Sequence, residues 1–305
     1  MYQPRRESHS EFVPIRNLTY HVRTWGTPSP AQPSLVLVHG WMDVSASWQF
    51  VVDAMARDRH VIAPDWRGFG LTEVPGADSF WFPDYLADLD ALLDHYLPDT
   101  PVDLVGHSMG GIASMQYAGV RPDRIRRLVN LEGFGMPPTR PAQAPGRYAR
   151  WLDEVRALHR GEGGLRPYPS AEAVAHRLMK NNRRLPEDKA QWLARHWARE
   201  RDGAWHILGQ PAHKIVSAHL FRADEVMEVY RQITAPVLWV QASGDEGDAG
   251  SRWWKAPAVQ AEVELRLNAV PNLRRRRVED AGHMLHHDQP AAVAHAIETF
   301  FSETR

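Results

Sequence analysis

Cysteine is absent from the 305-residue sequence, and long apolar runs are absent too. Without cysteine the chain has no disulfide, no thiolate metal site and no cysteine nucleophile. No segment approaches the roughly 20 apolar residues that span a bilayer. The first residues form no apolar stretch of the kind that a signal peptide needs. These absences lead us to expect a cytoplasmic protein with no membrane partner.

An excess of charge of one sign is also absent, because the formal net charge is −1. A chain with so little net charge has no overall field that attracts nucleic acid. The basic run Arg274–Arg277 lies on a predicted edge strand, beside acidic residues and without interleaved aromatic residues. Such a run is typical of a solvated face, so we expect no nucleic-acid partner.

Short apolar runs alternate with helical patterns along the chain. The runs are bounded by glycine or proline, which is typical of buried parallel strands. They lie at 35–38, 61–63, 102–105, 125–131 and 237–240. Apolar residues at helical spacing occur in 48–55, 85–96, 112–120 and 291–301. This alternation predicts an α/β fold, in which a mostly parallel sheet is flanked by helices.

The alternation is interrupted in the middle of the chain, where prolines open a segment nearly devoid of strand signals. The helical patterns of this segment are Arg147–His159, Ala171–Met179 and Asp188–Arg201. We therefore predict a core of residues 1–133 and 234–305, with a helical lid of residues 134–233 inserted between two late strands.

The motif Gly106-His107-Ser108-Met109-Gly110 follows an apolar strand and precedes a helical pattern. A G-x-S-x-G motif in this position places serine on a sharp turn above the C-terminal edge of the sheet. The helix N-terminus beneath it favours developing negative charge. These features predict Ser108 as a nucleophile, which still needs a base to take its proton.

His283 is the predicted base, because it follows the predicted strand 275–278 and precedes the last helix. His286 and His287 lie close by and make a rival assignment possible. Together with Asp288, the three histidines also suggest a metal. His283 is needed as the base and no further ligand set is evident, so we expect no metal.

Two carboxylates compete for the third place, the acid that orients the histidine. Asp245 follows the strand that begins at residue 237, and it is the predicted acid. Glu132 follows the preceding strand, and it is the alternative. Both positions lie at strand ends from which a side chain could reach His283.

A hydrolytic serine also needs backbone N–H groups that bind the oxyanion. Met109 comes directly after the nucleophile and is one predicted donor. Trp41 follows His39-Gly40 at the end of the first predicted strand, and it is the other.

Taken together, these motifs resemble those of the α/β-hydrolase superfamily, in its lidded single-domain form. The matching segments are Leu37–Trp41, Asp65–Gly70, Gly106–Gly110 and Asp280–Leu285, in the order found in that family. The resemblance runs from about residue 18 to 302 and leaves only the lid without a match. It implies an α/β-hydrolase fold and a cofactor-free hydrolase with a Ser-His-acid triad. Because the nucleophile position holds Ser108, aspartate-dependent relatives such as haloalkane dehalogenases and epoxide hydrolases are disfavoured.

The expected activity is hydrolysis of a carboxylic ester, lactone or thioester of a small molecule through an acyl-enzyme. Two alternatives remain open. The same triad could cleave a carbon–carbon bond or run a cofactor-free perhydrolysis. The chain could also be a catalytically inactive binding module, although inactive members of the family usually lack a triad residue. The oligomeric state does not follow from the sequence.

Overall fold

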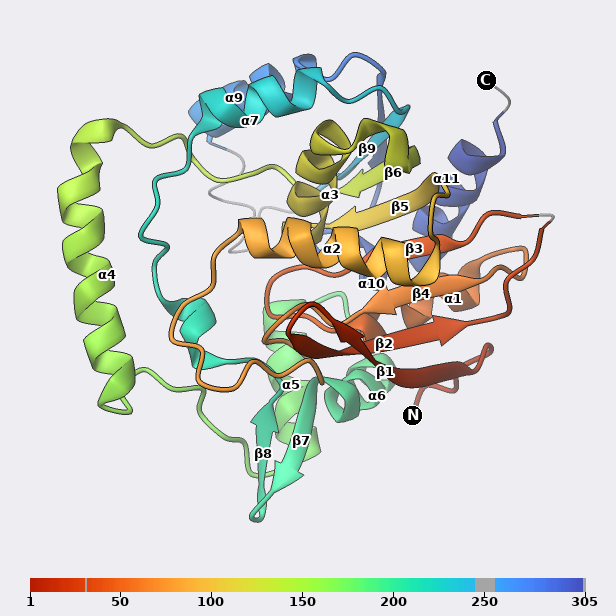
Figure 1. Ribbon diagram of the computed structural model, residues 1–305. Helices are drawn as coiled ribbons and strands as arrows, with labels where there is room; N and C mark the ends of the chain where they lie inside the picture. The colour runs from red at the N-terminus through yellow and green to blue at the C-terminus, as the bar shows by residue number, and fades with distance from the viewer. Residues whose placement is uncertain (31, 245–255, 304–305) are drawn as a thin grey trace.

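A computed structural model describes residues 1–30, 32–244 and 256–303. An eight-stranded sheet forms its centre, with strand order β1-β2-β4-β3-β5-β6-β9-β10 (Figure 1). In the order of the sheet, β2 pairs antiparallel with both β1 and β4. From β4 across to β10, all neighbouring strands pair in parallel. The strands are β1 (Ser8–Ile15), β2 (Leu18–Trp25), β3 (Leu35–Val38), β4 (Val61–Pro64), β5 (Val102–His107), β6 (Ile125–Leu131), β9 (Val237–Ala242) and β10 (Leu273–Val278). The predicted α/β fold is therefore confirmed.

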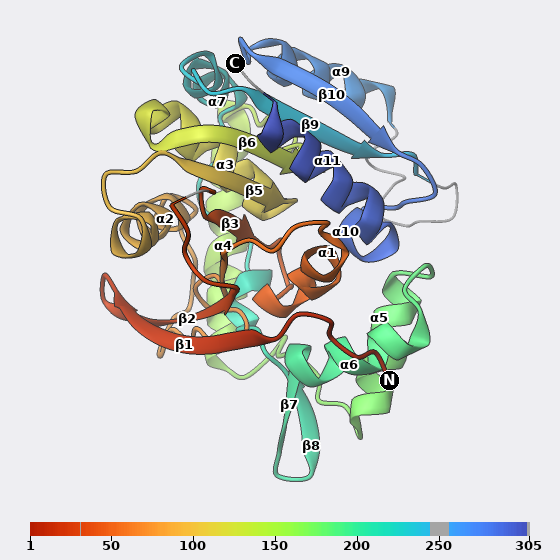
Figure 2. The same cartoon turned by 90° about the vertical axis from the view of Figure 1, so that its right-hand side faces the viewer.

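Helices cover both faces of this sheet (Figures 1 and 2). Those on one face are α2 (Pro83–Tyr96), α3 (Met109–Val120), α7 (Ala223–Arg231) and α9 (Pro257–Asn268). Those on the other face are α1 (Gln49–Ala54), α10 (Leu285–Asp288) and α11 (Pro290–Ser302). In β3, Val36 and Val38 pack on the first face, while Leu35 and Leu37 pack on the second. Because both of its faces are buried, β3 reads as a continuous apolar run.

The hairpin of β1 and β2 was not among the predicted strands. Its two-residue turn holds Arg16 at a φ of 54° and joins Ile15 to Leu18. β1 is an edge strand, and most of its side chains are exposed. An edge strand with so few buried apolar side chains gives a weak sequence signal.

The segment between β6 and β9 is mostly helical. Its elements are η3 (Pro141–Gln143), α4 (Ala144–His159), α5 (Ala171–Asn181), α6 (Glu187–Trp197), β7 (Ala198–Arg201), β8 (Ala204–Ile207), η4 (Pro211–Lys214) and α7. The predicted helix 188–201 is wrong at its C-terminal end, because helix α6 stops at Trp197 and a hairpin follows. Asp202 and Gly203 adopt φ values of 54° and 76° in the hairpin turn. Asp-Gly is a strong signal for such a turn, and it was missed.

The parts of this inserted segment attach to the core to different degrees. α5 and α6 pack against Phe50 of α1, and they bury Trp192 and Trp197. The Trp197 indole also donates to the carbonyl of Met42, at 2.8 Å. α7 approaches α3 so closely that a Cβ on Gly119 would lie 2.0 Å from the Val229 carbonyl oxygen. α4 instead stands away from the sheet and has no buried residue (Figure 1).

Among the helices within the described residues, none has the length and apolar character needed to cross a membrane.

Candidate active site

Ser108 lies at the sharp turn between β5 and α3. Its backbone has φ 50° and ψ −115°, a conformation that a side-chain-bearing residue rarely adopts. A Cβ on Gly106 would lie 2.4 Å from the Gly110 carbonyl oxygen, and one on Gly110 would lie 2.4 Å from the Val38 carbonyl oxygen. The two glycines of the motif therefore permit a backbone approach that no other residue allows, and the turn presents the serine at the strand end.

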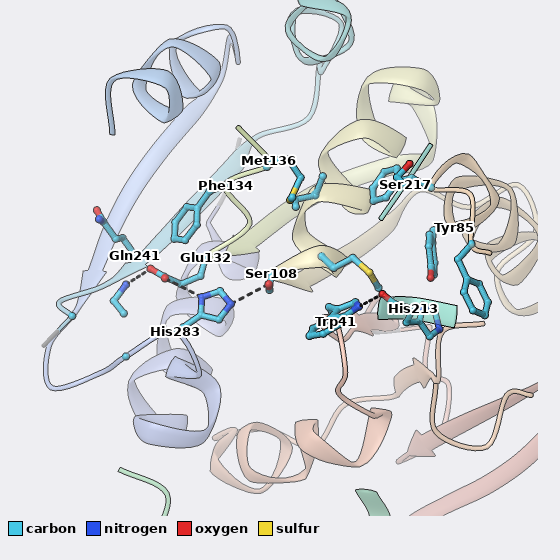
Figure 3. Close-up of a pocket in the computed structure, with 18 of the residues that line it drawn as sticks. Trp41, Tyr85, Ser108, Glu132, Phe134, Met136, His213, Ser217, Gln241 and His283 are labelled. Carbon is cyan, nitrogen blue, oxygen red and sulfur yellow. Dashed lines mark hydrogen bonds and ion pairs between the residues drawn. The ribbon is translucent and has the colours of Figure 1, made fainter. Parts of the chain in front are cut away.

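His283 and Glu132 complete a chain of hydrogen-bonding groups with Ser108 (Figure 3). His283 Nε2 lies 3.0 Å from Ser108 Oγ, and His283 Nδ1 lies 3.3 Å from Glu132 Oε2. The structure thus brings together the predicted nucleophile, the predicted base and the alternative acid. Asp245, the first choice for the acid, lies outside the described residues.

Several backbone contacts fix Glu132 at the end of β6. Its Oε1 accepts the N–H of Ala242 at 2.7 Å, and its own N–H donates to the Val240 carbonyl at 3.1 Å. The Asn130 side chain donates to the Gly133 carbonyl and accepts the Gly133 N–H, which fastens the turn that follows. The carboxylate is buried, with only 4% of the side chain exposed, so it is held in one orientation toward His283.

The loop after β3 lies beside the nucleophile. Its His39 ring accepts the N–H of Trp66 on Nε2 and donates to the carbonyl of Gly40 through Nδ1. A Cβ on Gly40 would lie 3.1 Å from the Ser108 Cβ, so only glycine lets this loop pass so close. Trp41, a predicted oxyanion donor, follows directly.

Met109, the other predicted donor, is the first residue of α3. The first N–H groups of a helix have no partner within the helix. This position is the one that an oxyanion donor next to Ser108 would need, and the role of Met109 stays a prediction.

A cavity of about 710 Å³ opens onto Ser108 and His283. Figure 3 shows Phe134 and Gln241 on the His283 side of Ser108, with Trp41, Tyr85 and His213 on the other side. Its lining is mainly apolar and includes Phe80, Phe82, Tyr85, Ile112, Met136 and Ile215. The sequence did not reveal these lining residues, because they come from a loop, two helices and the inserted segment. Their helical or loop patterns do not distinguish a cavity wall from ordinary packing.

His213 of η4 forms part of the cavity wall between two phenyl rings. Its ring stacks on Phe69 and on Phe80 with centroid distances of 3.7 Å in both pairs. Burial lowers the pKa of His213 to about 3, so the ring is neutral near pH 7. Its carbonyl accepts the Trp41 indole N–H at 3.3 Å, which ties the inserted segment to the loop after β3.

A second group of histidines lies beneath the nucleophile. Asp43, His107 and His286 are buried, and their potential ligand atoms lie within 4.8 Å of one another. His107 Nε2 is 2.8 Å from the His283 carbonyl oxygen, which it supports by a hydrogen bond. Burial holds the pKa of His107 well below its usual value. Asp43 Oδ1 accepts the Ser47 hydroxyl. All three side chains are sealed from solvent, and His107 and Asp43 already bond to protein atoms.

A strained serine above a parallel sheet, with a histidine and a carboxylate in line, defines a hydrolase-like site. A family model described as alpha/beta hydrolase fold matches residues 33–290. A serine hydrolase-like protein of Danio rerio is 25% identical over 240 residues, which cover 78% of this chain and 73% of that relative. The 2-hydroxy-6-oxo-2,4-heptadienoate hydrolase of Pseudomonas putida is 40% identical over 105 residues, 33% of this chain and 38% of the relative.

The thioesterase domain from the curacin biosynthetic pathway is a structural neighbour, with a TM-score of 0.81. It is 22% identical, and the match covers 96% of this chain and 99% of that domain. An identity this low shows a shared fold. With most of the chain matched by the family model, the protein belongs to the α/β-hydrolase family, and the expectation of a hydrolase agrees with these relatives.

Proposed function

We propose that the protein is a serine hydrolase that cleaves a carboxylic ester, lactone or thioester of a small molecule. The observation that carries this proposal is the line of three groups, with Ser108 Oγ 3.0 Å from His283 Nε2 and Glu132 3.3 Å from His283 Nδ1. A nucleophile, a base and an orienting acid in this geometry are the parts that acyl transfer to serine requires.

In the proposed mechanism, Ser108 Oγ attacks the substrate carbonyl while His283 takes the hydroxyl proton. The oxyanion accepts hydrogen bonds from the N–H groups of Trp41 and Met109, each worth on the order of 3 kcal/mol. His283 then protonates the leaving alcohol or thiol. Water, deprotonated by the same histidine, attacks the acyl-enzyme and releases the acid. Glu132 orients the ring and stabilises its charged form, and no cofactor takes part.

The cavity supports an apolar substrate. Its lining beyond Ser108 is formed by aromatic and aliphatic side chains such as Phe80, Phe82 and Ile112. Such a surface gains free energy by burying an alkyl or aryl group. We therefore expect esters of medium-length or aromatic acids to be better substrates than acetates. The inserted segment 134–233 acts as the lid over this cavity in our proposal.

The test is hydrolysis of a p-nitrophenyl ester series from acetate to decanoate. Ser108→Ala should lower kcat/KM by more than about a thousandfold. Glu132→Gln should lower kcat by up to about 10⁴-fold, because an uncharged partner no longer stabilises the charged ring.

Asp245→Asn is the matched comparison and should retain at least half of the activity. The opposite pattern, with Asp245→Asn inactive and Glu132→Gln active, would return the acid to Asp245. Absence of turnover of every ester by the wild type would contradict the esterase proposal.

Carbon–carbon bond hydrolysis is the second candidate. It is supported by the 40% identity to the 2-hydroxy-6-oxo-2,4-heptadienoate hydrolase, a match that spans 105 residues, or 33% of this chain. Loss of absorbance of a vinylogous 1,5-diketone, with no turnover of esters, would select this reaction. Perhydrolysis would be detected as peroxide-dependent peracid formation.

A further inference from the structure

The loop that carries His283 is fastened by one carboxylate, Asp288, at the end of α10. Asp288 Oδ2 accepts the N–H of Gly282, the residue before His283, at 2.8 Å. The other oxygen, Oδ1, accepts the side-chain N–H of Asn182 at 2.7 Å. One side chain therefore joins the backbone next to the proposed base to a residue of the inserted segment.

Asn182 is itself held in place at the C-terminal end of α5 (Figure 2). Its backbone N–H donates to the Leu178 carbonyl at 2.8 Å, and its Oδ1 accepts the N–H of Arg184 at 3.1 Å. With Oδ1 occupied by a donor, the amide nitrogen faces Asp288 in the correct orientation. A displacement of α5 would therefore pull directly on Asp288.

The core supports the same loop from another side. His107 donates to the His283 carbonyl at 2.8 Å, and Gln289 donates to the Asp280 carbonyl at 3.2 Å. The base must stay within hydrogen-bonding distance of Ser108, since misplacement by about 1 Å can cost a hundredfold in rate. Of the hydrogen-bonding groups named above, Asp288 is the one that also bonds to the inserted segment.

We propose that Asn182 and Asp288 are positioning residues, which couple the placement of the inserted segment to the placement of His283. This inference rests on the proposed function of His283. Neither residue lines the cavity, so their loss should slow the chemical step and leave substrate binding nearly unchanged. Asn182 is the end of the link that belongs to the inserted segment.

The experiment compares Asn182→Ala, Asp288→Asn and the double variant with a matched control. Gln191→Ala is the control, because Gln191 also lies in the inserted segment but its side chain, within the described part of the chain, bonds to Glu187 of the same helix and not to the His283 loop. We expect kcat for a p-nitrophenyl ester to fall about tenfold in each single variant, with KM within twofold. The double variant should be no slower than the slower single variant, because both act through one link.

Hydrogen exchange supplies a readout that does not depend on turnover. In Asn182→Ala, peptides covering residues 279–284 should exchange faster than in the wild type, while those of β5 and β6 should not change. Unchanged exchange and unchanged kcat in Asn182→Ala would overturn the inference. Faster exchange throughout the protein would also overturn it, because the role would then be general stability.

A failure of the proposed function gives a different pattern. If the wild type hydrolyses no ester, faster exchange at 279–284 in Asn182→Ala still supports the link, and its absence still rejects it. If Asp288→Asn does not fold, Asn182→Ala alone decides, since it removes the contact from the inserted segment and leaves Asp288 bonded to Gly282.

Discussion

Gly110 is one of the residues at which the nucleophile turn tolerates little change. A Cβ there would lie 2.4 and 2.6 Å from the carbonyl oxygens of Val38 and His39. Because backbone atoms cannot move aside cheaply, Gly110→Ala should lower the free energy of unfolding by about 1–3 kcal/mol. Urea unfolding followed by circular dichroism measures this change.

Gly146→Ala provides the control for that substitution. Gly146 lies in α4, and a Cβ there would meet no atom within 4 Å. Alanine in a helix is favoured over glycine by about 0.5–1 kcal/mol, so this variant should be slightly stabilised. Equal effects of the two substitutions would contradict the close approach at the turn.

The sequence alone singles out Ser108 and His283 as a predicted nucleophile and base, but it does not choose between the two candidate acids. The nucleophile needs a local pattern of small residues around a strained turn, and the segment Gly106–Gly110 contains that pattern. An acid needs only to lie close to the histidine in the folded chain, and no local motif marks it. Glu132, one candidate, is 151 residues from His283 in the sequence. Two strand ends satisfy that requirement in the sequence, so the choice between Glu132 and Asp245 stays a prediction, which the two acid substitutions test.

At the scale of elements, η4 is held to the core by the stack of Phe69, His213 and Phe80. His213→Ala removes the middle ring and leaves a gap in the cavity wall. We expect KM for a hexanoate ester to rise severalfold, because an apolar chain loses part of the surface that would bury it. Steady-state kinetics measure KM and kcat separately.

His219→Ala is the control in the same segment, because His219 is exposed and its ring lies 6.4 Å from Trp81. It should leave KM within twofold. An equal rise in KM for both variants would show that the stack itself does not shape the cavity.

Most helices and strands of the core, apart from the β1–β2 hairpin and α9, were predictable because each carries its own periodic pattern. The strands β3 and β4 are buried on both faces and read as uninterrupted apolar runs, whereas β5 and β6 also carry buried polar residues such as Asp103 and Arg127. The hairpin of β7 and β8 was not predicted, because the helical pattern of α6 continues by chance into Ala198–Arg201. The cavity lining was not predictable either, since it is assembled from α2, α3, η4 and the loops between them.

Over the whole molecule, buried neutral histidines make stability depend on pH. Burial lowers the pKa of His287 to about 3 in the folded chain, from an ordinary value of 6.5. Between these values the unfolded state binds more protons than the folded state, so stability rises with pH. As the pH falls from about 6.5 toward 3, the free energy of unfolding should drop by up to about 1.4 kcal/mol per pH unit for this group.

His287→Leu removes that contribution. The slope of the free energy of unfolding between pH 6 and pH 5 should become shallower by about 1 kcal/mol per pH unit. His95→Leu, at an exposed position of α2, is the control and should keep the wild-type slope. A steeper slope in His287→Leu would contradict a histidine that is neutral in the folded protein.

The central claim is that Ser108 is an activated nucleophile, and covalent labelling tests it most directly. The protein is incubated with an alkyl fluorophosphonate and its intact mass is measured, followed by peptide mapping. Our account predicts one adduct per chain, located on Ser108, absent in Ser108→Ala and formed much more slowly in Glu132→Gln. An unlabelled wild type, or an adduct that persists in Ser108→Ala, would contradict it.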